Sequence, residues 1–167
     1  MGVNYRMNFA HSLKQKEYFF MKYEILKELL GTTPRERAWS DKRTGKTYRE
    51  IRVQSRTSPF YTELYHLWYK NGKRTLNFEE VSKLDWLGLA IWFMDDGFKG
   101  TSGGSYISFY VYTDEEKEKM IAFLNEKFNL NARLHGNNKI YIPCKQGKIF
   151  KENIKQFMPK SMLYKIA

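Results

Sequence analysis

The sequence has a single cysteine, Cys144, among its 167 residues. One cysteine excludes an internal disulfide framework and a cysteine-rich zinc site. No stretch reaches the roughly 18 apolar residues that a membrane span requires, and no signal-peptide pattern opens the chain. We therefore expect an intracellular protein, in bacterial or phage-infected cytoplasm or an organelle matrix, that is not secreted.

Negative charge is also scarce. Only 18 Asp and Glu stand against 29 Lys and Arg, which gives a formal net charge of +11. Such an excess favours a polyanionic partner, with nucleic acid first and an anionic membrane surface second. Aromatic residues make up 17% of the chain, which is ample for a core and for contact surfaces. The length fits one compact domain and is too short for two independent ones.

The second half of the chain shows a clear series of elements. Residues 106–112 alternate with a period of two, which predicts a half-buried strand with Ile107 on its inner face. Thr113 and Glu116 form a capping-box pattern that begins a helix. The elements expected after it are a hairpin over 131–143 turning at 136–138, a helix around 148–157 and a basic tail at 160–165.

The same order of elements occurs earlier in the chain. Ser12 occupies the place of Thr113, with Gln15 at the third helical position and Gly31 after the helix. Two pseudo-equivalent halves of one α+β unit are therefore expected, over 1–78 and 79–167. The first half is predicted to contain a strand at 5–10, a helix to about Leu30, a hairpin over 33–55 turning at 41–45, a helix through 61–68 and a basic segment at 70–74.

An apolar segment, Leu87–Met94, runs directly into Asp95, Asp96 and Gly97. If residues 82–96 form one helix, both acids lie in its last turn, where the macrodipole makes carboxylates unfavourable. Gly97 fits the residue that follows a helix. A buried helix that delivers carboxylates to one point can hold a divalent cation. A core helix with a polar end is the alternative.

The string Leu89-Ala90-Ile91-Trp92-Phe93-Met94-Asp95-Asp96-Gly97 resembles the motif of the LAGLIDADG homing endonucleases. The resemblance extends from Tyr5 to Lys165 and includes the closing segment Pro159–Lys165. It implies an α+β fold of two αββαββα-type halves with saddle-shaped antiparallel sheets. The first half is incomplete at its N-terminus, because no motif helix precedes it.

The resemblance implies roles for particular residues. Asp96 matches the catalytic acid that binds metal, and Asp95 matches a less critical metal position. Lys165 matches an active-site lysine, and Arg74 stands at the equivalent place in the first half. Paired Mg²⁺ (or Mn²⁺) ions would activate water and relieve charge at the scissile phosphate. Each basic residue can alternatively be a plain phosphate contact or a solvated surface residue.

DNA recognition is expected from the outward faces of the strands, because a β-ribbon fits the major groove. Each of these residues taken alone can be an ordinary solvated strand residue. The predicted DNA-binding residues are Lys46, Tyr48, Arg52, Gln54, Tyr106, Ser108, Tyr110, Arg133, His135 and Lys139, and the same faces offer Arg37, Trp39, Glu50, Tyr112 and Tyr141.

Monomeric relatives carry two motifs, whereas this chain carries one. Three explanations stay open: dimerisation through the motif helix, a fragment that needs another polypeptide, or a remnant that binds DNA without cutting it. Gly88 and Ala90 would allow close helix packing. We expect duplex DNA and a second polypeptide or second copy as partners, and no membrane.

The leading hypothesis is a Mg²⁺-dependent endonuclease, or one subunit of one, that makes a double-strand cut at a long DNA target. A nucleic-acid-binding protein on the same fold without cleavage, such as an intron-splicing maturase or a DNA-binding regulator, is the main alternative. An unrelated basic α+β protein is the third.

Overall fold

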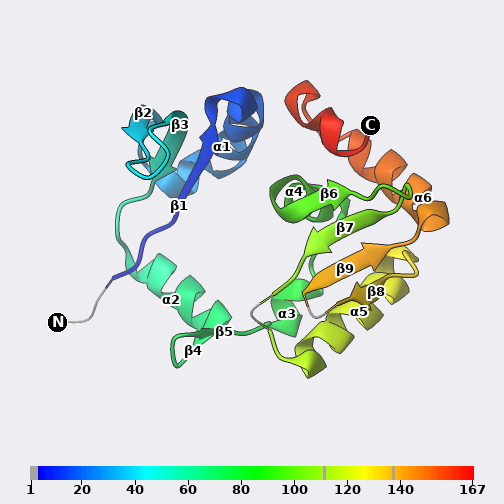
Figure 1. Cartoon of the computed structure of the whole chain (residues 1–167). Coiled ribbons are helices and arrows are strands. Elements are labelled where there is room, and N and C mark those ends of the chain that lie inside the picture. Colours follow the sequence, from blue (N-terminus) through cyan, green and yellow to red (C-terminus); the bar gives the residue numbers. More distant parts are fainter. Residues whose placement is uncertain (1–3, 111, 137) are drawn as a thin grey trace. The chain divides into compact units, whose positions relative to one another are not determined.

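The computed structural model describes residues 4–110, 112–136 and 138–167 (Figure 1). The chain divides into two compact units, Met1–Leu67 with Pro159–Met162, and Trp68–Met158 with Leu163–Ala167. This division falls earlier in the chain than the expected boundary after residue 78. Helices accompany antiparallel sheets in both units, as an α+β protein requires.

The first unit is a three-stranded antiparallel sheet in the order β1-β3-β2 with a helix packed on one face. Phe19 and Leu30 of the helix α1 are buried against Ile51 and Val53 of β3. These inward residues alternate with outward polar ones, which is the pattern of a half-buried sheet. The elements are β1 (Asn8–Ser12), a 3₁₀ turn (Leu13–Gln15), α1 (Lys16–Leu30), β2 (Arg35–Ser40), β3 (Thr47–Gln54) and α2 (Pro59–Trp68).

The start of α1 differs from the expectation. Ser12 accepts a hydrogen bond from the Lys14 amide and caps the short 3₁₀ turn, so α1 begins only at Lys16. The Gln15 side chain contacts the His11 ring instead of closing a capping box. Gly31 follows the helix in the left-handed conformation (φ +61°), as expected. The predicted hairpin over 33–55 is confirmed, with the Gly45 amide donating to Asp41 O at 2.8 Å in its turn.

The second unit contains a four-stranded antiparallel sheet in the order β6-β7-β9-β8. Ile107, Ile140 and Ile142 are fully buried on one face of it. The rings of Phe93 in α4 and Phe150 in α6 meet edge to face at 5.1 Å. The elements are β4 (Tyr69–Lys70), β5 (Lys73–Arg74), α3 (Phe78–Val81), α4 (Trp86–Asp96), β6 (Gly97–Lys99), β7 (Ser105–Ser108), α5 (Asp114–Phe128), β8 (Arg133–His135), β9 (Lys139–Ile142) and α6 (Cys144–Lys155), and the 3₁₀ helix η2 (Lys160–Lys165) passes from the first unit into the second.

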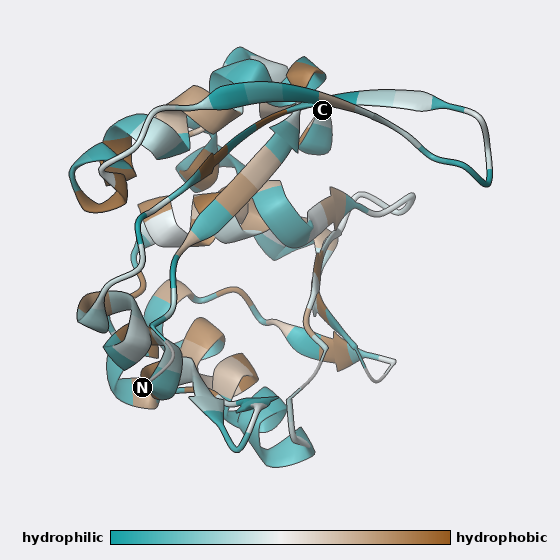
Figure 2. Ribbon diagram, turned by 90° about the vertical axis from the view of Figure 1, so that its left-hand side faces the viewer, coloured by the Kyte–Doolittle hydropathy of each residue, from teal (hydrophilic) through white to brown (hydrophobic). Residues whose placement is uncertain are grey.

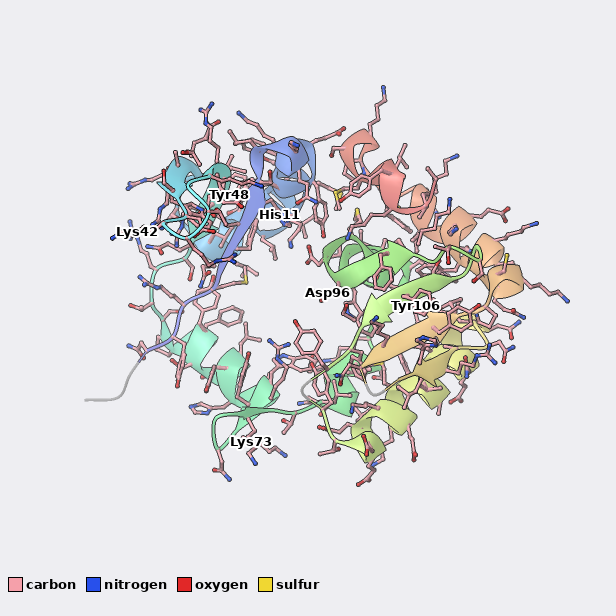
Figure 3. All side chains as sticks on the ribbon, viewed as in Figure 1. His11, Lys42, Tyr48, Lys73, Asp96 and Tyr106 are labelled. Carbon is pink, nitrogen blue, oxygen red and sulfur yellow. The ribbon has the colours of Figure 1, made fainter. Side chains whose placement is uncertain are left out.

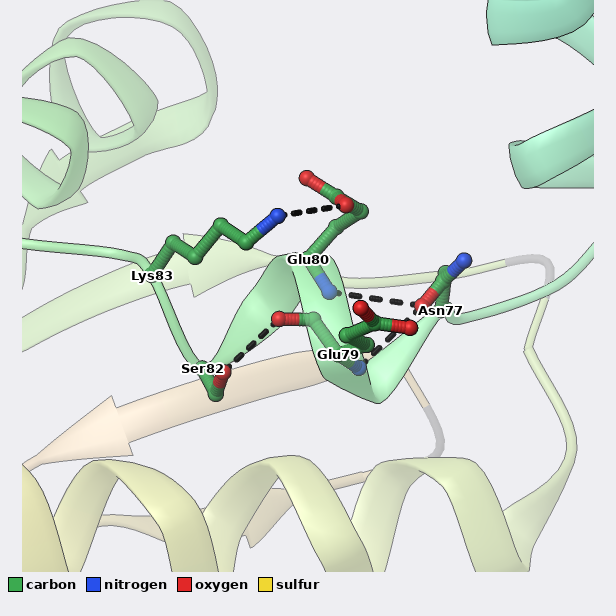
Figure 4. Close-up of polar contacts among 5 residues, drawn as sticks. All are labelled: Asn77, Glu79, Glu80, Ser82 and Lys83. Atoms are coloured by element: carbon green, nitrogen blue, oxygen red, sulfur yellow. Dashed lines mark hydrogen bonds and ion pairs between the residues drawn. The ribbon is translucent and has the colours of Figure 1, made fainter.

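The motif helix is shorter than the expected span of 82–96. Asn77 caps α3 by accepting hydrogen bonds from the amides of Glu79 and Glu80 (Figure 4). Asp85 then caps α4, accepting from the Gly88 amide at 2.8 Å. Because Asp85 caps it, α4 begins only at Trp86, after the expected start at 82, and the short helix α3 precedes that expected span.

Other predicted helices and strands are present, but some begin or end at residues other than those expected. The capping box of Thr113 and Glu116 is present in full. The strand expected over 106–112 ends at Ser108, and its residue Val111 lies outside the described residues, as does Asn137 of the predicted turn. Helix α6 begins four residues earlier than expected, and β6 was not predicted at all.

Hydropathy follows this architecture. Figure 2 shows hydrophilic and hydrophobic residues alternating along most of the helices, as amphipathic elements require. None of the helices in the described part of the chain is long and apolar enough to cross a membrane.

Candidate active site and DNA-binding surfaces

Helix α4 presents the two adjacent carboxylates at its C-terminal end. Leu89 and Phe93 are fully buried and fix the helix in the core, while Asp95 and Asp96 are exposed at its last turn. Figure 3 shows Asp96 at this end of the helix. The carboxylates are therefore held by a rigid, buried element and remain accessible.

Gly97 ends the helix for a reason that differs from the expected one. Its backbone is extended (φ −93°, ψ 160°) and begins β6, so no left-handed glycine cap forms. A Cβ at this position would collide with the Phe93 ring and lie 2.6 Å from the Phe93 carbonyl oxygen. Glycine is needed here for space and not for a positive φ.

Lys165 lies beside the carboxylates. Its Nζ donates hydrogen bonds to the carbonyl oxygens of Gly97 at 2.9 Å and Asp95 at 3.4 Å. Burial lowers the pKa of Lys165, and the negative charges of Asp95 and Asp96 partly offset that effect. The structure thus brings Lys165 beside two carboxylates that lie about 70 residues earlier in the chain.

Arg74 reaches the same region from β5. It lines a pocket of 540 Å³ together with Asp96, Ser108 and Tyr110. Its guanidinium donates to the Tyr69 hydroxyl at 3.2 Å, and this hydrogen bond raises the pKa of Arg74. The Tyr112 hydroxyl is a second partner of the guanidinium.

Two members of this pocket had other expected roles. Ser108 and Tyr110 were predicted to contact DNA on the outward sheet face, and the structure places both on the wall shared with Asp96. Tyr112 was expected on that face as well, and its contact with Arg74 was not anticipated. The period-two pattern located these residues, but the pocket also takes lining residues from α4 and from the segment of Arg74, which that pattern does not show.

The donor groups suit a hard divalent cation only in part. Asp95 and Asp96 offer carboxylate oxygens, the ligand type that Mg²⁺ takes. Among the described residues no group of three or more His, Cys, Asp or Glu side chains stands close enough to hold a metal ion. The two adjacent carboxylates are thus the only donors of this kind that the described part of α4 places at its C-terminal end.

The first unit presents a polar sheet face opposite to its core. Arg52 pairs with Arg35 and Ala10 across the strands, and Gln54 pairs with Asn8. Tyr48 stacks on Trp39 with ring centroids 4.9 Å apart. The predicted residues Tyr48, Arg52 and Gln54 share this face.

Lys46 differs from that group. It lies in the turn before β3 begins at Thr47, so its position is not fixed by the strand register.

The second unit has an outward face of aromatic and basic residues. Tyr106 stacks on Phe98 at 5.2 Å and lies 4.9 Å from the Tyr141 ring (Figure 3). The Arg133 guanidinium lies over Tyr141 at 5.1 Å, and the Lys139 ammonium over Phe98 at 5.5 Å. This face therefore holds two cations on a layer of rings.

Two further residues lie beside the Tyr106 ring. His135 joins the predicted set, 5.2 Å from the Tyr106 ring. Phe98 was missed because the three residues of β6 are too few to show a period of two.

The expected helix-packing residues occupy different environments. Ala90 is fully buried in this chain, so it offers no surface to a second polypeptide and that part of the expectation is corrected. Gly88 is half-buried, and a Cβ added there would lie 2.8 Å from Leu84 Cδ1. Its small size is thus explained by packing within the chain.

Comparison with known proteins decides the family. The family model described as the LAGLIDADG DNA endonuclease family matches residues 1–157. The chain belongs to this family. The expectation from the motif at Leu89–Gly97 is therefore confirmed.

Two curated proteins and one solved structure are similar to the chain along nearly its whole length. It is 27% identical over 173 residues to cytochrome b mRNA maturase bI2 of Debaryomyces hansenii, covering 99% of the chain and 66% of the maturase. It is 25% identical to DNA endonuclease I-ChuI of Chlamydomonas applanata, covering 100% of the chain and 85% of that enzyme. The solved structure of the homing endonuclease I-WcaI bound to its DNA recognition sequence superimposes with a TM-score of 0.83 at 24% identity, covering 99% and 76%. This last likeness confirms the LAGLIDADG fold.

Proposed function

We propose that the chain supplies the DNA-binding sheets and one catalytic carboxylate of a site-specific, homing-type endonuclease that cuts both DNA strands. The observation that carries this proposal is the end of α4, where Asp96 stands with Lys165 and lines one pocket with Arg74. A carboxylate flanked by two cations suits a reaction that increases negative charge on a phosphate.

Asp96, with Asp95 beside it, would hold Mg²⁺ (or Mn²⁺), which supplies an activated water and charge neutralisation when bound. Lys165 would place its ammonium at the scissile phosphate, held there by the carbonyl oxygens of Gly97 and Asp95. Arg74 would contact a phosphate oxygen through its planar guanidinium. Because only one motif is present, a second copy or another polypeptide would contribute the other carboxylate.

DNA would be recognised in the major groove by the outward faces of both sheets. Arg52, Arg133 and Gln54 have side chains able to pair bidentately with guanine or adenine. Lys46 and Lys139 would contact phosphates. The similarity to the DNA-bound I-WcaI structure supports duplex DNA as the partner.

A cleavage selection tests this function. The purified chain and its Asp96→Asn variant each meet a randomised duplex library, with Mg²⁺ or with Ca²⁺. Cutting by the wild type in Mg²⁺ alone, and not by the variant, is the expected result. Cutting by both proteins would remove Asp96 from the reaction. Binding by the wild type without cutting would show that one motif does not suffice.

The maturase bI2 relative favours a second candidate, an RNA-binding maturase that keeps the fold. This function predicts tight binding of intron RNA and no cutting of any library member. Competition between structured intron RNA and duplex DNA separates the two functions. A preference for RNA of tenfold or more, about 1.4 kcal/mol, would favour the maturase.

A further inference from the structure

A groove in the first unit is lined by four arginines, Arg6, Arg35, Arg52 and Arg56. Its volume is 1060 Å³, and the rest of its wall contains three threonines and Ser55. No Asp or Glu lies among its lining residues in the described part of the chain. The groove is therefore purely basic, with hydroxyl groups between the cations.

The charges of these arginines are not compensated within the unit. Elsewhere in it, Glu36 pairs with Lys16 at 3.0 Å and with Arg49 at 3.6 Å. Over residues 4–110, 112–136 and 138–167, no ion pair joins an acid to any of the four groove arginines. Like charges that are grouped without acids create a positive potential that attracts anions.

The register of the sheet places two of the arginines in direct opposition. Arg35 of β2 and Arg52 of β3 are cross-strand partners. Like charges directly opposite each other destabilise an antiparallel pair. Stability therefore does not account for this arrangement, whereas an anion bound between the guanidinium groups does.

The other two arginines are positioned by backbone pairing beyond the strand ends. The Ser55 amide donates to Met7 O at 2.8 Å, and the Met7 amide donates to Ser55 Oγ at 3.0 Å. These bonds hold the segments that carry Arg6 and Arg56 side by side. Thr32 Oγ1 donates to Gln54 O at 2.5 Å and closes the groove wall.

We propose that this groove binds phosphates of the DNA backbone next to the base pairs that the β1-β3-β2 sheet contacts. Guanidinium groups bind phosphate oxygens bidentately, and hydroxyl groups add neutral hydrogen bonds. Arg52 belongs to both the groove and the outward sheet face, so a duplex on that face continues into the groove. This proposal rests on the proposed function and adds a second contact region to it.

The test uses the full chain and a fluorescein-labelled duplex of random sequence, because phosphate contacts are independent of sequence. Affinity is measured over a series of salt concentrations for the wild type and the double variant Arg6→Gln/Arg56→Gln. The plot of log K against log salt concentration has a negative slope. Loss of two phosphate contacts should make this slope shallower by about 1.8. Arg49→Gln, which removes a charge from the opposite face, leaves the slope within experimental error.

The double variant Arg6→Lys/Arg56→Lys keeps both positive charges and controls for effects of the Gln substitutions on folding. Its salt dependence of DNA binding is expected to stay close to that of the wild type. An unchanged slope in the Gln variant would overturn the proposal that the groove binds phosphates, but it would not contradict DNA binding by the outward sheet faces. Absence of duplex binding by the wild type would overturn the proposed function itself. Loss of intron RNA binding by the Gln variant, with DNA binding unchanged, would assign the groove to RNA and also overturn the proposal.

Discussion

Lys165 owes its position to two backbone carbonyl groups rather than to an acidic side chain. Its Nζ donates to the oxygens of Gly97 and Asp95, while burial lowers the pKa of the ammonium. In the proposed function, an ammonium held by backbone carbonyl groups would keep its charge directed at a phosphate near Asp95 and Asp96.

Lys165→Ala is expected to slow cutting by about 100-fold or more, the usual cost of removing one electrostatic donor, with a much smaller loss of DNA affinity. Single-turnover cleavage and equilibrium binding measure the two effects separately. An equal loss in both would make Lys165 a plain phosphate contact.

The same residue predicts a pH dependence. The ammonium is charged below its pKa, and burial lowers that pKa, so the rate should fall with rising pH earlier than for an exposed lysine. Lys165→Arg moves this fall to higher pH because arginine stays charged. A pH profile that is identical for both proteins would contradict the prediction.

The Tyr69 hydroxyl accepts a hydrogen bond from the Arg74 guanidinium at 3.2 Å and thereby orients it. Because Arg74 is exposed, solvent weakens this bond, so Tyr69→Phe should lower the cutting rate by about threefold to tenfold. In an Arg74→Ala background the same substitution should have no further effect. Additive effects in this double-mutant cycle would show that the two residues act independently.

Gly97 and Gly147 provide a matched pair of glycines. Gly97→Ala forces a methyl group into Phe93 and should destabilise the fold by about 1–3 kcal/mol. Gly147 lies within α6 with its nearest atoms at 3.7 Å or more, so Gly147→Ala should stabilise the helix by about 0.5–1 kcal/mol. Urea unfolding measures the change in unfolding free energy for both variants. A change of the same sign in both would contradict the prediction.

Among the elements, those with local signals could be predicted from the sequence. The capping box of α5 and the hairpin turn at 41–45 depend on neighbouring residues and are present as expected. The later start of α4 was missed because its cap residue Asp85 falls inside the segment 82–96 that was expected to be helical. Strand β6 exists only through its pairing with β7, which no local pattern shows.

Glu116 links two elements of the second unit. Its carboxylate accepts hydrogen bonds from the amides of Leu76 at 2.7 Å and Thr113 at 2.9 Å. Desolvation alone would raise the pKa of Glu116, but these hydrogen bonds outweigh it and the pKa lies below its usual value of 4.5. The stability from this group is therefore fully present above that value and is lost as pH falls through the lowered pKa.

Glu116→Ala should cost about 0.5–2 kcal/mol through the lost cap. The difference in unfolding free energy between wild type and variant should shrink below pH 4.5. Urea unfolding from neutral to acidic pH measures this difference. A difference that stays constant with pH would exclude the carboxylate as its source.

For the whole molecule, the site could be predicted only in part. The motif located Asp95 and Asp96, but the pocket that Asp96 shares with Arg74 and Tyr112 depends on packing between segments that are distant in the sequence. The net charge of +11 indicated a polyanionic partner, yet it did not show that four arginines line one groove. The chain spans 66% of the bI2 maturase.

The claim that Asp96 holds the catalytic cation is tested most directly by Mn²⁺ binding, which requires no cutting. Electron paramagnetic resonance measures the Mn²⁺ bound to the chain with duplex DNA, in excess of that bound to the duplex alone. The account predicts that Asp96→Asn loses most of this excess while DNA affinity stays nearly unchanged. Undiminished Mn²⁺ binding by the variant would contradict it.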